Sequence, residues 1–258
     1  MAETSEPVFE LISQGQNSAP IMFVCEHASN HMPEKYNNLG LPDHLLESHI
    51  AWDPGSDPVT RRMSEVLGMP AFLGTASRLL YDLNRPPDVP DAIRERSEIF
   101  DVPGNMNLSA QAKQERINTY YTPYHDTLEN VLERQSGLQA IVTVHSFTPI
   151  FHGKIREVEI GILHEADARL ADAMLQAAPR HTDMVVRRND PYGPQDGVMH
   201  TLREHGVKRG RLNVMLEIRN DLIKTHEQCV AMGDMLSALV VDALELDGHA
   251  PMIRGQGA

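Results

Sequence analysis

Two histidines stand where predicted buried strands end, a position suited to metal binding. The apolar run 20–25 leads into His27, and the β-branched run 140–144 leads into His145. A lone histidine at such a place is more often structural, but two of them together favour a metal site. A hydrolytic zinc site takes three nitrogen or oxygen ligands and leaves a fourth position for water. Because the chain has only two cysteines, a metal site has to be built from histidines and carboxylates, and we expect the third ligand to be a carboxylate.

We expect Asp53 to be that carboxylate ligand. It lies in the turn sequence WDPG at 52–55, directly ahead of a predicted helix. An aspartate there could instead cap the turn or the helix N-terminus. Glu26 is expected to point away from His27 if the strand alternation continues. Asn30 is a poor ligand for zinc.

Glu217 closes the late apolar strand 212–218 and is the candidate general base. A carboxylate in such a place is partly buried, so its charge needs a metal, a proton or the nearby Arg219. Beside a metal it could accept the proton of an attacking water, whereas the alternative is an ordinary ion pair with Arg219. His125, on a predicted helix, could donate to a developing oxyanion, but a surface or core-edge histidine fits that position equally well.

The segment 77–85 places Arg78 and Arg85 in a mostly apolar context. Guanidinium groups grip carboxylates through two parallel hydrogen bonds, so the pair indicates an anionic small-molecule substrate. Asp82 could orient one guanidinium. The alternative is that Arg78 and Asp82, four residues apart, only pair with each other.

The elements that must position these residues alternate between strands and helices, which favours an α/β sheet covered by helices on both faces. The long loop 86–108 is expected to be functional or mobile. Expected strands are 20–25, 70–73, 78–83, 140–144, 158–163, 184–186 and 212–218. Expected helices are 57–67, 109–134 with a bend near Pro123, 166–178, 198–205 and 225–246. We expect one domain over residues 1–258, with a flexible tail from about 248 to 258.

Composition excludes several classes of function. The net charge of −13 opposes binding to nucleic acid, because phosphate backbones repel an acidic chain. No apolar run reaches the roughly 20 residues of a membrane helix, and the acidic start lacks the pattern of a secretory signal. With so few cysteines, a disulfide framework is excluded and a cytoplasmic location is expected.

These motifs resemble the N-formylglutamate amidohydrolase family, in family order from about residue 20 to residue 221. That family is similar in turn to zinc carboxypeptidases and aspartoacylases. The resemblance implies a three-layer α/β/α sandwich around a mixed, mostly parallel sheet, and one zinc ion. The matching motifs are Glu26-His27-Ala28-Ser29, Asp53-Pro54-Gly55, Ser77-Arg78-Leu79-Leu80-Tyr81-Asp82-Leu83-Asn84-Arg85, Tyr124-His125, His145-Ser146-Phe147 and Leu216-Glu217-Ile218-Arg219.

The resemblance also implies roles: His27 and His145 bind the metal, Asn84 and Arg85 grip the substrate carboxylate, and Glu217 is catalytic. The implied reaction hydrolyses N-formyl-L-glutamate, or a similar small N-acyl amino acid, to formate and glutamate. Two positions depart from the pattern: Asn30 stands where related enzymes have glutamate, and residues 26–29 replace Pro-His-Ser-Gly. The first departure favours an alternative, a non-catalytic binder of acidic amino acids that has lost its metal.

Overall fold

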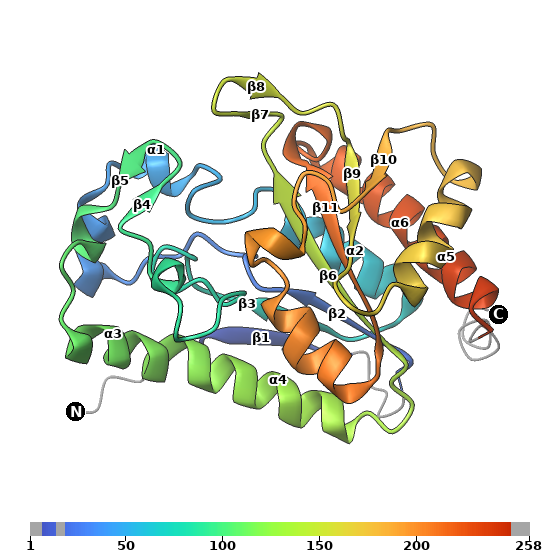
Figure 1. The fold of residues 1–258 in the computed structure, drawn as a ribbon, viewed down its shortest axis with the longest axis horizontal. Helices are drawn as coiled ribbons and strands as arrows, with labels where there is room; N and C mark the ends of the chain where they lie inside the picture. Colours follow the sequence, from blue (N-terminus) through green and yellow to red (C-terminus); the bar gives the residue numbers. More distant parts are fainter. Residues whose placement is uncertain (1–6, 14–18, 249–258) are drawn as a thin grey trace.

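A mixed seven-stranded sheet forms the centre of the computed structural model, in which residues 7–13 and 19–248 are described (Figure 1). Its neighbours run parallel except at the pairs β1/β3 and β11/β9, which are antiparallel. Across the sheet the strands are β1 (Phe9–Ile12), β3 (Ala71–Gly74), β2 (Ile21–Cys25), β6 (Ala140–Phe147), β11 (Leu212–Arg219), β9 (Ile160–Leu163) and β10 (Val186–Arg188).

Helices cover both faces of the sheet, so the expected three-layer α/β/α sandwich is confirmed (Figure 1). One face packs against α2 (Ser56–Leu67), α5 (Arg169–Ala177) and α6 (His226–Leu246). The other packs against α4 (Thr122–Arg134), which follows α3 (Ala110–Arg116) and a π-helical turn, Ile117–Tyr121. That turn lies just before Pro123, where the sequence predicts a bend.

The shorter elements lie in the connections between these layers. They include α1 (Asp43–Leu46) and two hairpins, β4 (Arg96–Ser97) with β5 (Phe100–Asp101) and β7 (Ile150–Phe151) with β8 (Lys154–Ile155). A second π-helical turn spans Leu202–Gly206. The 3₁₀ segments are Glu34–Gly40, Pro90–Ala92, Pro103–Asn105, Ala178–Arg180, Pro194–Asp196, Val207–Arg209 and Asn220–Leu222.

Local sequence explains why these elements form. Successive residues of β2 point to opposite faces, with Phe23 toward the α2/α6 layer and Val24 toward the α4 layer. Both faces are buried, which is why the strand is apolar throughout. Ser109 caps α3 by accepting the Ala112 N–H at 3.1 Å, and Gly68 ends α2 in the left-handed conformation with φ +63°. These start and stop signals are local, so the sequence identifies them.

The structure corrects one expected strand. Residues 78–83 form turns rather than a strand, although they are apolar and buried. Their carbonyls are satisfied by side chains instead of a neighbouring strand: Asn105 Nδ2 donates to Leu79 O at 2.9 Å and Arg116 Nη1 to Leu80 O at 3.1 Å. The expected loop 86–108 contains the β4–β5 hairpin, and the expected helix 198–205 is largely the second π-helical turn.

Two further expectations concern the C-terminal tail and membrane-spanning helices. Of the tail at 248–258, residues 249–258 lie outside the described residues. In the described ranges, every helix is too short or too polar to cross a membrane.

Candidate active site

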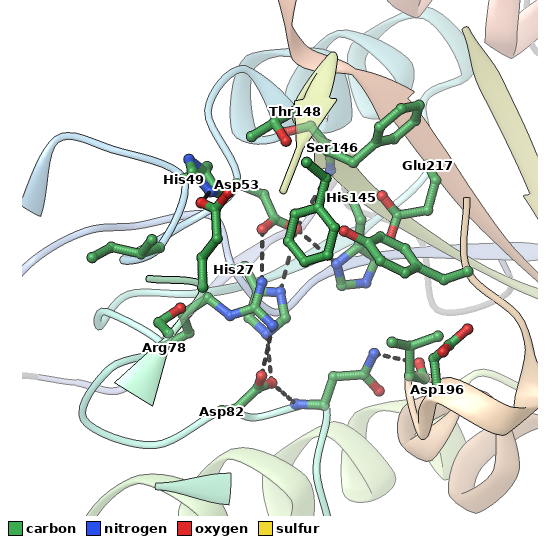
Figure 2. A pocket seen from close by; sticks show the side chains of 18 of the residues that line it. His27, His49, Asp53, Arg78, Asp82, His145, Ser146, Thr148, Asp196 and Glu217 are labelled. Carbon is green, nitrogen blue, oxygen red and sulfur yellow. Dashed lines mark hydrogen bonds and ion pairs between the residues drawn. The ribbon is translucent and has the colours of Figure 1, made fainter. Parts of the chain in front are cut away.

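A cavity of about 270 Å³ opens where strands β2, β6 and β11 end (Figure 2). These strands run parallel, so their carboxyl ends meet at one edge of the sheet, where α/β folds place their sites. The lining contains most of the predicted site residues: His27, Asp53, Arg78, Asn84, Arg85, His145 and Glu217.

His27, Asp53 and His145 converge at the cavity wall. Each offers one ligand atom within 4.8 Å of the other two, and all three residues are buried. The Asp53 Oδ2 atom lies 3.3 Å from His27 Nδ1 and 2.9 Å from His145 Nδ1. Within the described ranges this is the group of histidine, cysteine or acidic residues that can hold a metal. The three side chains predicted as ligands are therefore brought together.

The outer nitrogen of each histidine faces a second buried carboxylate. His27 Nε2 lies 2.7 Å from Asp82 Oδ1, and His145 Nε2 lies 3.1 Å from Glu26 Oε2. Such outer carboxylates fix the ring orientation of metal-binding histidines and raise their basicity. Glu26 reaches this place because the chain turns directly after Cys25, and its carboxylate meets His145 rather than His27.

Tight local geometry positions Asp53. Its backbone N–H donates to His27 O at 3.0 Å, which joins the two predicted ligands through the main chain. Gly55 follows with φ +85°, and a Cβ atom there would lie 2.5 Å from Ile223 O. The carboxylate does not cap α2, since that helix has Gly55 as its N-cap and no side-chain cap. The capping alternative is therefore not what the structure shows.

The donor set fits a divalent transition metal. Two imidazoles and one carboxylate are the chemistry of open catalytic zinc sites. Burial alone would raise the pKa of Asp53, but the charges of His27 and Arg78 and the hydrogen bonds from both histidines hold it below its ordinary value. Burial opposes the charge of His145, whereas Glu26 and Asp53 raise its pKa well above the ordinary value. A metal and protons would therefore compete for the same nitrogen.

Asn30 does not take part in this cluster. Its Nδ2 donates to Leu46 O at 2.9 Å, a structural contact away from the metal group. The carboxylate in the group that could hold a metal belongs to Asp53. The departure at position 30 therefore no longer favours a chain that has lost its metal.

Glu217 lies on β11, next to β6, and is paired in register with His145 of the candidate metal-binding residues. Burial raises its pKa to about 7, against the opposing charge of His145. Its Oε2 atom is buried with no hydrogen-bond partner among the described residues. Arg219 instead donates to Asp221 Oδ1 at 2.8 Å and approaches Glu159. The salt-bridge alternative for Glu217 is thus not what the structure shows.

Arg78 bridges two carboxylates of the site. Its Nη1 donates to Asp53 Oδ1 at 3.0 Å and its Nη2 to Asp82 Oδ2 at 2.6 Å. The alternative pairing of Arg78 with Asp82 is therefore present, but it is not isolated, because Arg78 also binds Asp53. Asn84 lines the cavity, but its side-chain amide is hydrogen-bonded to the backbone. Its Nδ2 donates to Val198 O at 2.6 Å and its Oδ1 accepts from Thr201 N at 3.0 Å.

His125 is not brought to the cavity. Both ring nitrogens are engaged elsewhere, Nδ1 with His205 Nε2 at 2.9 Å and Nε2 with Leu83 O at 2.8 Å. It belongs to a buried group with His200, His205 and Tyr121, behind the site. The ring is not among the cavity-lining side chains, so the structure gives no support to a donor role toward an oxyanion.

Sequence reasoning missed four side chains at the site. Strand alternation predicts that Glu26 points away from His27, and the cavity-lining residues Arg94 and Tyr192 stand in no local sequence pattern. Arg156 packs over the rings of Phe147, Phe151 and Tyr192, with its Cζ atom 4.4–5.5 Å from their centroids. Only the spacing of Glu26, next to His27, offered a signal in the sequence.

Comparisons with known proteins agree with this geometry. A solved gene product of Agrobacterium tumefaciens is 46% identical, with TM-score 0.91 over 94% of this chain and 97% of that one. An N-formylglutamate amidohydrolase from Ralstonia eutropha JMP134 shares the fold, with TM-score 0.62 and 21% identity over 94% and 97% of the two chains. A search of curated proteins gives no significant match. The family model of N-formylglutamate amidohydrolase matches residues 19–224, and the chain therefore belongs to this family of amidohydrolases.

Proposed function

We propose that this protein is a metal-dependent amidohydrolase that cleaves the amide of a small N-acyl amino acid, with N-formyl-L-glutamate as the first substrate to test. The observation that carries the proposal is the meeting of His27, Asp53 and His145 in one cavity with Glu217, whose Oε2 atom has no hydrogen-bond partner among the described residues. Family membership supports the amide as the bond that is hydrolysed.

His27, Asp53 and His145 would hold the metal, most simply zinc. A bound zinc ion supplies Lewis-acid chemistry, polarising a carbonyl and making water acidic near neutral pH. The outer carboxylates of Asp82 and Glu26 keep both imidazole rings in place for that ion.

Glu217 is the residue that moves protons in this proposal. A pKa near 7 lets it accept the proton of the attacking water and return it to the leaving nitrogen. Water adds to the formyl carbon, the C–N bond breaks, and formate and the free amino acid leave. Arg85, at the cavity wall, grips the substrate carboxylate, while Asn84 ties this wall to the segment 198–201. Release of a free acidic amino acid is consistent with an enzyme of the cytoplasm.

Metal content and hydrolysis should be measured on the same sample. Protein purified without chelator should contain about one zinc ion per chain and release formate from N-formyl-L-glutamate. Asp53→Asn should lose most of the bound metal and the activity, because a neutral amide is a poor zinc ligand. Asp57→Asn, four residues along in α2 and paired with Arg61, is the matched control and should keep both. Metal-free wild-type protein with full activity would contradict the proposal.

A further inference from the structure

The cavity wall includes two guanidinium groups, those of Arg85 and Arg94, that few carboxylates approach closely. The charge of Arg78 is matched by Asp53 and Asp82. Arg85 and Arg94 share a single further acid, Asp91, which lies 2.9 Å from Arg85 Nε and 3.7 Å from Arg94 Nη2.

Arg85 is the deeper of the two guanidinium groups, with only 7% of its side chain exposed. Its Nε and Nη1 atoms are buried, and the described residues offer them no hydrogen-bond acceptor. Asp91 is near but out of line for a hydrogen bond to Nε. Buried donors left unpaired cost free energy, so an anion that enters the cavity would find prepared donors here.

Arg94 lies nearer the rim, with 28% of its side chain exposed. Its Nε atom donates to the Asp91 carbonyl at 3.3 Å, and the carboxylates near its Nη2 atom are more distant, Asp82 Oδ2 at 3.5 Å and Asp91 Oδ2 at 3.7 Å. Burial and the charges of Arg78 and Arg85 lower the pKa of Arg94, although a guanidinium stays charged at neutral pH. An additional anion would relieve this repulsion.

We propose that Arg85 and Arg94 form a two-carboxylate recognition site, each gripping one carboxylate of an N-acyl dicarboxylic amino acid. This inference rests on the proposed function, and it assigns the second carboxylate to Arg94 rather than to Arg78. Arg78 holds the carboxylates of the metal group. Asp91, half exposed, balances the two arginines before substrate binds and competes with the substrate carboxylates.

Binding of glutarate and glutaramate tests the proposal, because the two probes differ by one carboxylate. Calorimetry on the protein as purified should show glutarate binding about 10- to 100-fold tighter, the range of a hydrogen-bonded charge. Arg94→Gln should reduce this ratio to less than about 3-fold, and Arg94→Lys should give an intermediate ratio because it keeps the charge but loses the fork. Arg96→Gln, on the exposed β4 strand, is the matched control and should keep the wild-type ratio.

Asp91→Asn separates recognition from a merely structural role. Removing the competing acid should tighten glutarate binding at least about 3-fold, the opposite direction from Arg94→Gln. Weaker glutarate binding in both variants, or an unchanged ratio in Arg94→Gln, would overturn the proposal.

A kinetic comparison keeps this inference distinct from the proposed function. In an active enzyme, Arg94→Gln should lower kcat/KM for N-formyl-L-glutamate far more than for N-formyl-L-glutamine. If the enzyme is active but Arg94→Gln lowers kcat/KM equally for the two substrates, the role of Arg94 is refuted and the proposed function is not. Glutarate binding that depends on Arg94, in a protein that hydrolyses no N-formyl amino acid, would refute the proposed reaction and leave the recognition site standing.

Discussion

At the scale of single residues, the site is a group of buried charged side chains that form ion pairs with one another. Asp53 faces both histidines through Oδ2 and Arg78 through Oδ1, and Asp82 faces His27 and Arg78 in the same way. Each buried charge thus has a partner of opposite sign, which is the condition for charges to persist in an interior. Glu217 differs from these residues, since its Oε2 atom has no hydrogen-bond partner within the described part of the chain and burial raises its pKa to about 7.

Glu217→Gln should abolish most of the activity while the protein stays folded and keeps its metal. The amide keeps the shape of the side chain but cannot accept a proton, so kcat should fall by about 10²- to 10⁴-fold. Formate release, zinc content and melting temperature should be measured on one sample. Asp221→Asn, which removes a partner of Arg219 at the same strand end, is the control and should keep its turnover. A Glu217→Gln enzyme that is active but destabilised would rule out the general-base role.

At the scale of elements, the turn before α2 and the loops around the cavity set the geometry. Gly55 allows the chain to pass against Ile223 O, which holds Asp53 beside His27. On the opposite wall, Arg156 ties the β7–β8 hairpin to the loop that carries Tyr192, donating to its hydroxyl at 3.1 Å. Of the three candidate ligands, β6 supplies His145, and the turns after β2 and before α2 supply His27 and Asp53.

Gly55→Ala should weaken metal binding as well as stability. A Cβ atom 2.5 Å from a backbone carbonyl forces the turn to move, and Asp53 moves with it. Gly153→Ala is the matched control, because Gly153 also has positive φ, +74°, but nothing within 4 Å. The control should lose only about 1 kcal/mol of unfolding free energy from backbone strain. Zinc titration and urea unfolding of both variants would show whether Gly55→Ala loses more; equal losses with unchanged zinc affinity would contradict this reasoning.

Arg156→Leu should raise KM and leave kcat nearly unchanged. Its guanidinium lies over three rings that line the cavity, and each cation–π contact contributes about 0.5–1 kcal/mol. Loss of this packing loosens the wall without touching the metal group, so KM should rise about 3- to 30-fold. Lys154→Ala, at the exposed tip of the same hairpin, should change neither constant. If kcat alone fell for Arg156→Leu, the wall would have a different role.

At the scale of the whole molecule, a second group of buried histidines lies between the sheet and the π-helical turns. Burial lowers the pKa of His125 to about 3 and of His200 to about 4, and it also lowers the pKa of His205. His200 faces Glu204, His205, Arg203 and Glu26, and its Nε2 pairs with the Tyr121 hydroxyl at 2.9 Å. Their contacts join the segment carrying His200 and His205 to Tyr121, His125 and Glu129. Because their pKa values are lowered, protonating these rings costs free energy in the folded state.

The stability that these three histidines contribute should fall as pH drops below about 6.5, the pKa of an unfolded-chain histidine. There the unfolded chain binds protons that the folded chain does not, and the loss continues down to about 4 for His200. Urea unfolding at pH 7.5 and 5.0 measures it. His200→Gln should make the difference between the two pH values smaller by about 1–2 kcal/mol. His44→Gln, an exposed histidine of α1, should leave the difference unchanged. An unaltered pH dependence in His200→Gln would show that this residue is charged in the folded state.

The sequence by itself determined the elements and the order of the reacting residues. Continuous apolar runs, caps and glycine stops are local properties, so most strands and helices, and the strand ends carrying His27, His145 and Glu217, could be predicted. The tertiary structure decided which other side chains join them. Glu26 meets His145 from 119 positions away because the chain turns after β2, and Asp82 meets His27 because residues 78–83 turn instead of forming a strand. The packing of loops and layers brings Arg94 and Tyr192 to the cavity and keeps His125 away from it. These contacts are non-local, so they produce no periodic pattern in the sequence.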